Sequence, residues 1–137
     1  MSQERIPVLW IGQVAVVTLP GEIDVNNADL VREDLLSVLD QGALLLVADL
    51  SKTTFCDSAG VSALVRTFRR ATATAGSMRL VVATPAVQRV LAITGVDRLV
   101  DVFPSVAASL AGPNDQAGQP PSESATAKAD TDGGGTA

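Results

Sequence analysis

The sequence predicts a small α/β domain with a mixed, mostly parallel sheet of four to five strands and about four helices. Three observations lead to this prediction. Short runs of Val and Leu alternate with segments of helical periodicity. Hydrophobic residues make up 47 % of the 137 residues and aromatic residues only 3 %, which is typical of a sheet buried among aliphatic side chains. Strands that are separated by helices pair in parallel, because the helix serves as a crossover.

The first elements are expected to form an antiparallel hairpin. Residues 7–11 and 14–19 are rich in β-branched side chains, and Gly12-Gln13 joins them. Pro20-Gly21 is a turn signal, and residues 22–25 are expected to be short and extended.

A helix and a central strand follow. Asn26 or Asn27 is a suitable N-cap for a helix that runs to about Gln41, and Gly42 suits the position after its end. Residues 44–50 are apolar on both faces until Asp49, as expected of a strand in the middle of a sheet.

The second half repeats this alternation. Residues 51–58 are expected to be a loop, and residues 59–74 a helix that ends before Gly76. A strand is expected at 79–83, followed by a helix from Pro85 to about Thr94.

The folded part is expected to end at residue 111, after a short strand at 99–103 and a last helix that Pro104 opens. Residues 112–137 contain no Val, Ile, Leu, Met, Phe, Trp or Cys, and we expect a disordered, acidic tail there. The domain organisation is therefore one folded unit over 1–111 and a tail over 112–137.

Composition excludes several classes of function. The chain has no His or Tyr, and Cys56 is its single cysteine, so Ser-His-Asp and Cys-His catalytic sets and the usual zinc sites cannot be built. The net charge of −5 argues against nucleic acid and against an anionic membrane surface as partners. From these absences we expect no enzyme activity, no cofactor and no metal. We also expect a cytoplasmic location, because the N-terminus lacks the features of a signal peptide.

The stretch Asp57-Ser58-Ala59-Gly60 carries the most information about function. It lies between the apolar run 44–50 and a helix, which places a serine hydroxyl at the start of that helix. Backbone N–H groups at a helix N-terminus are unpaired and favour a negative charge, so a phosphate on Ser58 is tolerated there. Ser58 or Asp57 can equally be a simple N-cap, and the residues alone leave that choice open.

Four features of the sequence resemble the STAS domain family, and within it the bacterial anti-sigma factor antagonists. Residues 21–24 (Gly-Glu-Ile-Asp) resemble the motif before the first helix. Residues 46–50 and 55–61 (Phe-Cys-Asp-Ser-Ala-Gly-Val) resemble the phosphorylation loop. Residues 93–99 and 102–110 resemble the segments that follow the third helix.

This resemblance implies a partner-switching regulator of transcription, as used in bacterial stress responses. In such a regulator, an unphosphorylated antagonist binds an anti-sigma factor and frees a sigma factor. The anti-sigma factor is itself a serine kinase, and the matching phosphorylation site here is Ser58. A serine phosphatase removes the phosphate from Ser58. The antagonist is expected to be a monomer when free. The implied partner surface, called the switch surface below, consists of Asp24, Asp57, Ser58, Ala59, Gly60 and Val61.

Two other functions stay open at this point. STAS domains also occur as small subunits that stabilise an ATPase partner in transport complexes, a role that needs no cycle at Ser58. A third possibility is a nucleotide or small-ligand sensor that uses the helix start as a phosphate site. Single residues also have alternative explanations. Asp24 can complement the dipole of the next helix. Gly60 can reflect a packing constraint or close approach by the backbone of a partner, and both can hold.

Overall fold

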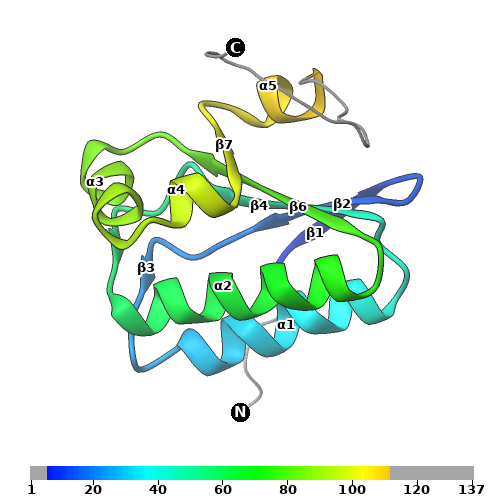
Figure 1. The fold of residues 1–137 in the computed structure, drawn as a ribbon, viewed down its shortest axis with the longest axis horizontal. Coiled ribbons are helices and arrows are strands. Elements are labelled where there is room, and N and C mark those ends of the chain that lie inside the picture. The colour runs from blue at the N-terminus through cyan, green and yellow to red at the C-terminus, as the bar shows by residue number, and fades with distance from the viewer. Residues whose placement is uncertain (1–5, 112–137) are drawn as a thin grey trace.

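The computed structural model describes residues 6–111, in which a five-stranded sheet has the order β1-β2-β4-β6-β7 (Figure 1). Strand β1 is antiparallel to β2, and the other neighbouring strands are parallel, which confirms the predicted hairpin and the mixed, mostly parallel sheet. The strands are β1 (Val8–Ile11), β2 (Val14–Thr18), β4 (Leu45–Leu50), β6 (Ser77–Val82) and β7 (Asp101–Phe103).

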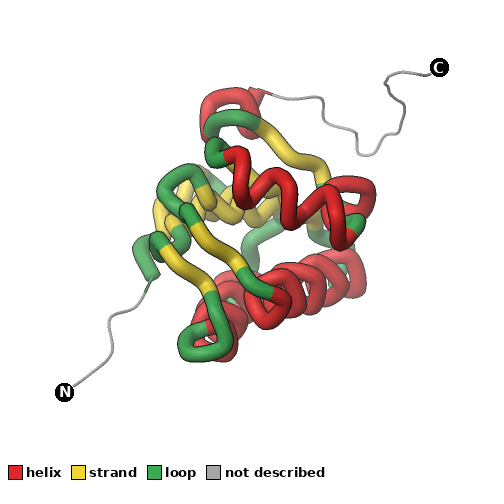
Figure 2. The backbone as a smooth tube through the Cα atoms, turned by 90° about the vertical axis from the view of Figure 1, so that its left-hand side faces the viewer, coloured by secondary structure: helices red, strands yellow, loops and turns green. Residues whose placement is uncertain are grey.

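A second, two-stranded sheet lies at one end of the domain. Strand β3 (Glu22–Ile23) pairs in parallel with β5 (Phe55–Cys56). Figure 2 looks onto this end of the molecule and shows the two short strands side by side. The prediction of a loop over 51–58 was wrong in this detail, because a two-residue strand is too short to leave a periodic pattern in the sequence.

Helices cover both faces of the large sheet, unequally. Helices α1 and α2 lie side by side on one face, and α5 lies on the other (Figure 1). Five helices occur among residues 6–111, one more than the four predicted. They are α1 (Ala28–Asp40), α2 (Ser58–Ala73), α3 (Pro85–Thr94), α4 (Val96–Leu99) and α5 (Val106–Ala111).

The main core lies between the sheet and the pair α1 and α2. Alternate residues of the central strands point into it, because side chains alternate across a strand. Ala15 and Val17 of β2, Leu46 of β4 and Leu80 of β6 are completely buried there, as is Leu35 of α1. The buried residues of α3 and α4 belong to the same core, so these elements form one folded unit.

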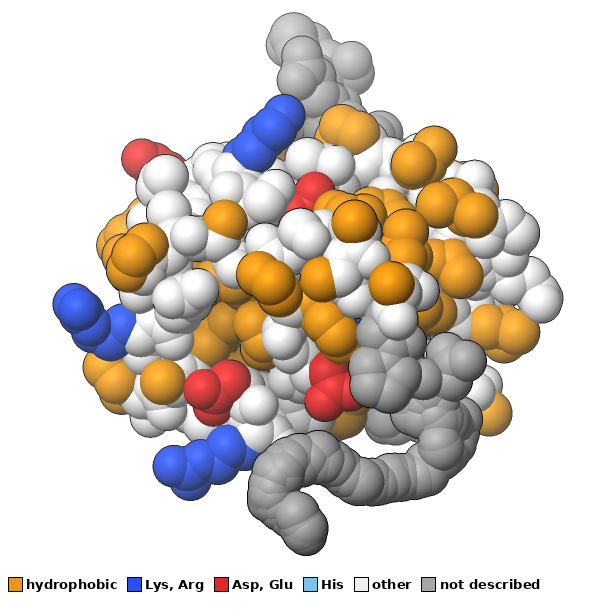
Figure 3. Space-filling view, turned by 90° about the horizontal axis from the view of Figure 1, so that it is seen from above, with side chains coloured by type: hydrophobic (Ala, Val, Ile, Leu, Met, Phe, Trp, Pro, Cys, Tyr) orange, Lys and Arg blue, Asp and Glu red, His pale blue; other side chains and the backbone are white. Residues whose placement is uncertain are grey.

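The opposite face of the sheet has a smaller core beneath α5. Val16, Val47 and Val81 are buried there, and Val106 of α5 packs against them. Arg79 of β6 is buried on this side, donates a hydrogen bond to the backbone carbonyl of Ser109 and places its guanidinium carbon 5.4 Å from the Phe103 ring centroid. Figure 3 views this face from above and shows hydrophobic side chains spread across it.

Two predicted boundaries near the end of the domain were wrong. The strand expected from Leu99 begins at Asp101, because residues 96–99 form the single turn α4, in which Val100 N–H donates to the Val96 carbonyl (2.9 Å). The last helix begins at Val106 and not at Pro104, since the Ser105 hydroxyl accepts from Ala108 N–H (3.0 Å) as an N-cap does.

No helix within residues 6–111 is both long and apolar enough to cross a bilayer. The expected tail, residues 112–137, lies outside the described residues.

Candidate functional site: the start of helix α2

Asp57 is the N-cap of α2. Its backbone is extended (φ −94°, ψ −171°), and its Oδ1 accepts a hydrogen bond from Gly60 N–H at 3.0 Å. This bond satisfies one of the amides that have no acceptor within the first turn of a helix. The capping position that the sequence left open between Asp57 and Ser58 therefore belongs to Asp57.

The same carboxylate ties two distant segments together. Asp57 Oδ2 accepts from Val25 N–H at 3.2 Å, and Asp57 N–H donates to the Ile23 carbonyl at 3.1 Å. Val25 lies in the turn between β3 and α1. One acidic side chain thus holds the turn before α1 against the start of α2.

Ser58 is the first residue of α2 and is exposed. Its hydroxyl makes no hydrogen bond with any residue in the described part of the chain, because Asp57 already performs the capping. The hydroxyl is therefore available to a partner or an enzyme from solvent, and the amide groups of the first helical turn would favour a negative charge placed on it.

Gly60 is fixed by packing. A Cβ atom at this position would lie 2.6 Å from Cys56 Sγ and 2.8 Å from Ile23 Cγ2, closer than real Cβ contacts allow. The helix start therefore rests directly on the β3–β5 pair, and only glycine permits that approach. Of the two explanations for this glycine, the structure supports the packing constraint.

Cys56 lies beneath the helix start and is 3 % exposed. Burial, with a smaller contribution from the negative charge of Asp57, raises the pKa of its thiol from 9.0 to about 11. A buried thiol with a raised pKa is a poor nucleophile, so Cys56 acts here as a small apolar side chain.

Asp24 and Asn27 shape the turn that Asp57 holds. Asp24 Oδ1 accepts from Asn26 N–H at 2.9 Å, and Asn27 Oδ1 accepts from Asp24 N–H at 2.9 Å. Asn27 Nδ2 donates to the Glu22 carbonyl at 2.8 Å. Asp24 therefore helps to shape the turn before α1. The hydrogen bond from Val25 to Asp57 connects this turn to the start of α2.

The structure divides the switch surface into two layers. Ser58 is exposed, while Asp24, Asp57 and Ala59 are half-buried. Gly60 and Val61 are buried, so they support this surface from below and present little area to a partner.

The sequence reasoning missed two apolar side chains beside the site. Val25 is 75 % exposed and Phe55 is 50 % exposed, and they come from the two segments that Asp57 joins. Exposed large apolar side chains that rim a polar site are typical of a protein contact surface. Their position next to the polar turn residues in the sequence was a usable signal for both.

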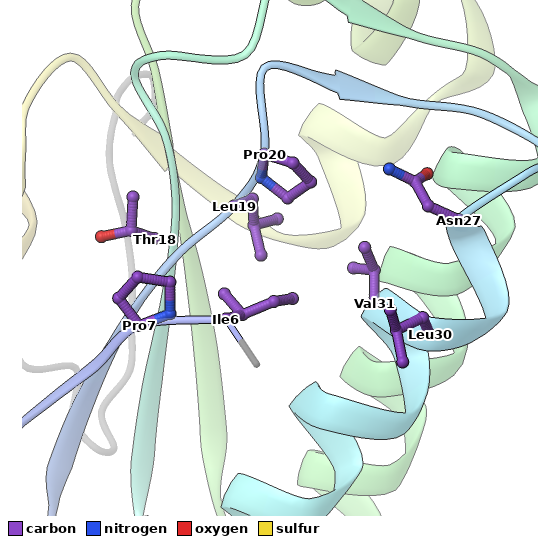
Figure 4. A pocket seen from close by; sticks show the side chains of 8 residues that line it. All are labelled: Ile6, Pro7, Thr18, Leu19, Pro20, Asn27, Leu30 and Val31. Atoms are coloured by element: carbon purple, nitrogen blue, oxygen red, sulfur yellow. The ribbon is translucent and has the colours of Figure 1, made fainter. Parts of the chain in front are cut away.

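A small cavity lies beside the turn that precedes α1 (Figure 4). Its volume is about 270 Å³, and its walls come from the residues before β1, the end of β2 with the residues after it, and the start of α1. Asn27 and Thr18 are its polar lining residues, and the rest of the wall is apolar: Ile6, Pro7, Leu19, Pro20, Leu30 and Val31. Within residues 6–111, no group of three or more acidic, Cys or His side chains is arranged to hold a metal ion.

Residues 5–109 match the family profile of the STAS domain. The chain belongs to the STAS domain family. The resemblance noted in the motifs is thereby confirmed, and the STAS match covers the whole of the described fold except its last two residues and includes the start of α2.

Relatives of this STAS chain include regulators of sigma factors. The chain is 34 % identical over 86 residues to the anti-sigma-B factor antagonist of Bacillus subtilis (strain 168), which covers 63 % of this chain and 78 % of that protein. The crystal structure of an anti-sigma factor antagonist from Mycobacterium paratuberculosis superposes with a TM-score of 0.72 at 27 % identity and covers 77 % of this chain and 90 % of that one. The anti-sigma factor antagonist SpoIIAA in its unphosphorylated form shares the fold with a TM-score of 0.66 at 21 % identity, and the match covers 77 % of this chain and 92 % of that one.

Proposed function

We propose that this STAS domain is an anti-sigma factor antagonist that switches partners through phosphorylation of Ser58. Unphosphorylated, it binds an anti-sigma factor in the cytoplasm and releases a sigma factor. The anti-sigma factor is also the serine kinase that modifies Ser58, and a serine phosphatase reverses the modification. The family and the antagonists among its relatives support this assignment.

The observation that carries the proposal is the free hydroxyl of Ser58 on a helix start that another residue caps. A serine whose hydroxyl capped its own helix would have to replace that hydrogen bond with one through the phosphate when it is phosphorylated. Asp57 performs the capping here, and Ser58 is exposed without a partner among the described residues. Phosphorylation at Ser58 therefore breaks no hydrogen bond that the described fold uses.

Phosphate at Ser58 would act on the complex and leave the fold intact. It adds a charge of about −1.5 to −2 at neutral pH. The dipole of α2 favours this charge and the Asp57 carboxylate opposes it, so the two effects partly cancel within the domain. A partner surface shaped for a neutral serine would have to desolvate a dianion, which is unfavourable without a matching cation.

The surface around Ser58 suits a protein partner of that kind. Val25 and Phe55 offer exposed apolar area on the two segments that Asp57 joins at the start of α2, where Asp24, Asp57 and Ala59 are half-buried. Contact on the apolar side chains would supply most of the affinity, and the phosphate at the centre would decide whether contact is possible.

The test is binding by Ser58→Ala and Ser58→Glu baits in a pull-down from the native cell lysate, read by mass spectrometry. We expect a kinase-like anti-sigma factor to follow Ser58→Ala and to be lost with Ser58→Glu. Ser62→Glu is the matched control, since Ser62 is also exposed and lies one helical turn further along α2. That control should retain the partner.

Other outcomes would favour the other functions. Recovery of the same transport ATPase by both Ser58 baits would replace the proposal with a role as a subunit beside that ATPase. Saturable heat of binding with ATP or GTP alone would indicate a nucleotide sensor. A circular dichroism spectrum that changed grossly on phosphorylation would contradict the view that the switch acts by occlusion.

A further inference from the structure

Strand β1 forms one edge of the five-stranded sheet, and all four of its side chains are apolar and exposed. Val8 is 36 % exposed, Leu9 60 %, Trp10 39 % and Ile11 48 %. These four exposed large hydrophobic side chains are consecutive in the sequence, whereas the others among residues 6–111 are scattered singly. Sets of this kind mark interaction surfaces.

The backbone of β1 also offers hydrogen bonds to a further strand. In its pairing with β2, Pro7 carbonyl accepts from Thr18 N–H at 3.0 Å, and the register continues as Leu9 with Val16. Hydrogen-bonded and non-hydrogen-bonded pairs alternate along an antiparallel ladder. Val8 and Trp10 therefore direct their N–H and C=O groups away from β2, toward the open edge.

The two edges of the sheet differ in protection. At the opposite edge, β7 has only three residues, carries the exposed Asp101 and is followed at once by Pro104. Charges and prolines at an edge prevent pairing with other chains. Residues 8–11 contain neither, and Pro7, which precedes them, directs its backbone toward β2, where its carbonyl accepts from Thr18 N–H. The open edge of β1 therefore lacks the features that keep an edge strand single.

We propose that β1 pairs with the β1 strand of a second copy of this chain, antiparallel and about a two-fold axis at Leu9. Residues opposite each other in such a pair share a face of the sheet. Leu9 lies on the α5 face with its β2 partner Val16, and Val8 and Trp10 lie on the α1 face with Val17 and Ala15. A two-fold axis normal to the sheet preserves these faces.

The register at Leu9 follows from the outward groups of Val8 and Trp10. Val8 of each copy meets Trp10 of the other as a hydrogen-bonded pair, which gives about four inter-chain hydrogen bonds. The two Leu9 side chains meet at the axis as a non-hydrogen-bonded pair, where side chains are closest. Aliphatic and aromatic cross-strand pairs are favourable, and no charge on β1 opposes them.

A second copy is the occupant that this strand fits best, because the same four residues complement themselves. An isologous contact uses one surface twice and closes as a dimer. The contact involves only the four residues of β1 in each chain, whereas stable interfaces bury at least about 1,200 Å² in total. The dimer is therefore weak, and the expected monomer exists at low concentration. The dimer contact does not involve Ser58, so the test of the dimer does not depend on partner switching.

Sedimentation velocity over a range of concentrations tests the dimer. We expect the wild-type mass to rise from one chain toward two, with a blue shift in the emission of Trp10, the single tryptophan. Leu9→Lys places two like charges at the axis and should raise the midpoint concentration at least ~tenfold. Ile93→Lys is the control, because Ile93 is 77 % exposed on α3 and carries the same change away from β1; it should leave the midpoint unchanged.

Disulfide trapping tests the register. In a Cys56→Ala background, Leu9→Cys should form an inter-chain disulfide in a glutathione buffer, because Cα atoms of a non-hydrogen-bonded pair are about 4.5 Å apart. Ile93→Cys in the same background should not. A wild-type chain that stays monomeric at its solubility limit, equal midpoints for the two lysine variants, or no trapping at Leu9 would each overturn the proposal.

Discussion

Helices α1 and α2 lie side by side, yet their first turns are built in opposite ways. Asp57 caps α2 with its side chain, whereas Asn27, the N-cap of α1, makes no side-chain bond to its own helix. Asn27 instead binds Glu22 and Asp24 in the turn before the helix. The third residue is Gly60 in α2, pressed against β3 and β5, and Leu30 in α1, which lines a cavity of about 270 Å³.

This difference shows which of the two helix starts is more closely packed and hydrogen-bonded. The start of α2 is held by a cap, by the bond from Val25 to Asp57 and by contact with Cys56 and Ile23. The start of α1 is held by its preceding turn and has free space beside it. A modification on a tightly held helix start changes what a partner meets without moving the fold, which is the property that a switch at Ser58 needs.

Gly60→Ala should produce the largest loss of stability. Alanine is favoured over glycine in a helix by about 1 kcal/mol, but its Cβ would overlap Cys56 Sγ and Ile23 Cγ2. We expect a net loss of about 2 kcal/mol in the free energy of unfolding, measured by urea denaturation. Gly21→Ala is the control, since its nearest atom, the Lys52 carbonyl oxygen, is 3.8 Å from the added Cβ. Equal effects of both changes would show that the start of α2 is not close-packed.

Cys56 beneath α2 should make stability depend on alkaline pH. Its pKa is about 11 in the folded chain against 9.0 in the unfolded one, so folding favours the protonated thiol. The resulting stability is complete below pH 9 and is lost as the pH rises toward 11, by about 2 kcal/mol. Urea denaturation between pH 7 and pH 11 should show this loss in the wild type and much less of it in Cys56→Ala. A parallel decline in both proteins would assign the loss to other groups.

The N-caps of α2 and α1 should respond differently to substitution. Asp57→Ala removes the bonds to Gly60 and Val25 and should cost about 1–2 kcal/mol. Asp57→Asn retains an acceptor oxygen for Gly60 and should cost less than half of that. Asn27→Ala should destabilise the turn before α1 by about 1 kcal/mol, through its bonds to Glu22 and Asp24. Thermal unfolding compares the three variants, and equal losses for Asp57→Ala and Asp57→Asn would mean that the negative charge matters more than the capping bond.

The sequence predicted most of the scaffold because long periodic segments determine it. The bounds of α1 and α3 and the apolar run of β4 were readable from spacing and from Asn27, Gly42 and Pro85. Strand β5 and helix α4 were not predicted, because two to four residues hold no period and their form depends on contacts with distant segments. For the same reason the link from Asp57 to Val25, 32 residues away, could not be predicted from local patterns.

Substitutions just after the ends of α1 and α2 should have the smallest effects on stability, and they compare how the two helices end. Helix α1 is followed by Gly42 at φ +107°, whereas α2 is followed by Ala75 at φ +65°, a left-handed conformation that disfavours any side chain. The sequence suggested that Gly76 ends this segment, but the left-handed residue lies one position earlier. Ala75→Gly should therefore stabilise the domain by about 0.5–1 kcal/mol, and Gly42→Ala should destabilise it by a similar amount.

Thermal unfolding with matched heating rates measures both changes. Gly42 is a fair comparison because a Cβ there would meet nothing within 4 Å, so its substitution tests backbone conformation alone. A stabilising Ala75→Gly shows that α2 ends under strain while its start is held by packing. If Ala75→Gly destabilised the domain, the conformational entropy that glycine adds to the unfolded chain would outweigh the backbone strain that it relieves at position 75. The end of α2 would then be no more strained than the end of α1.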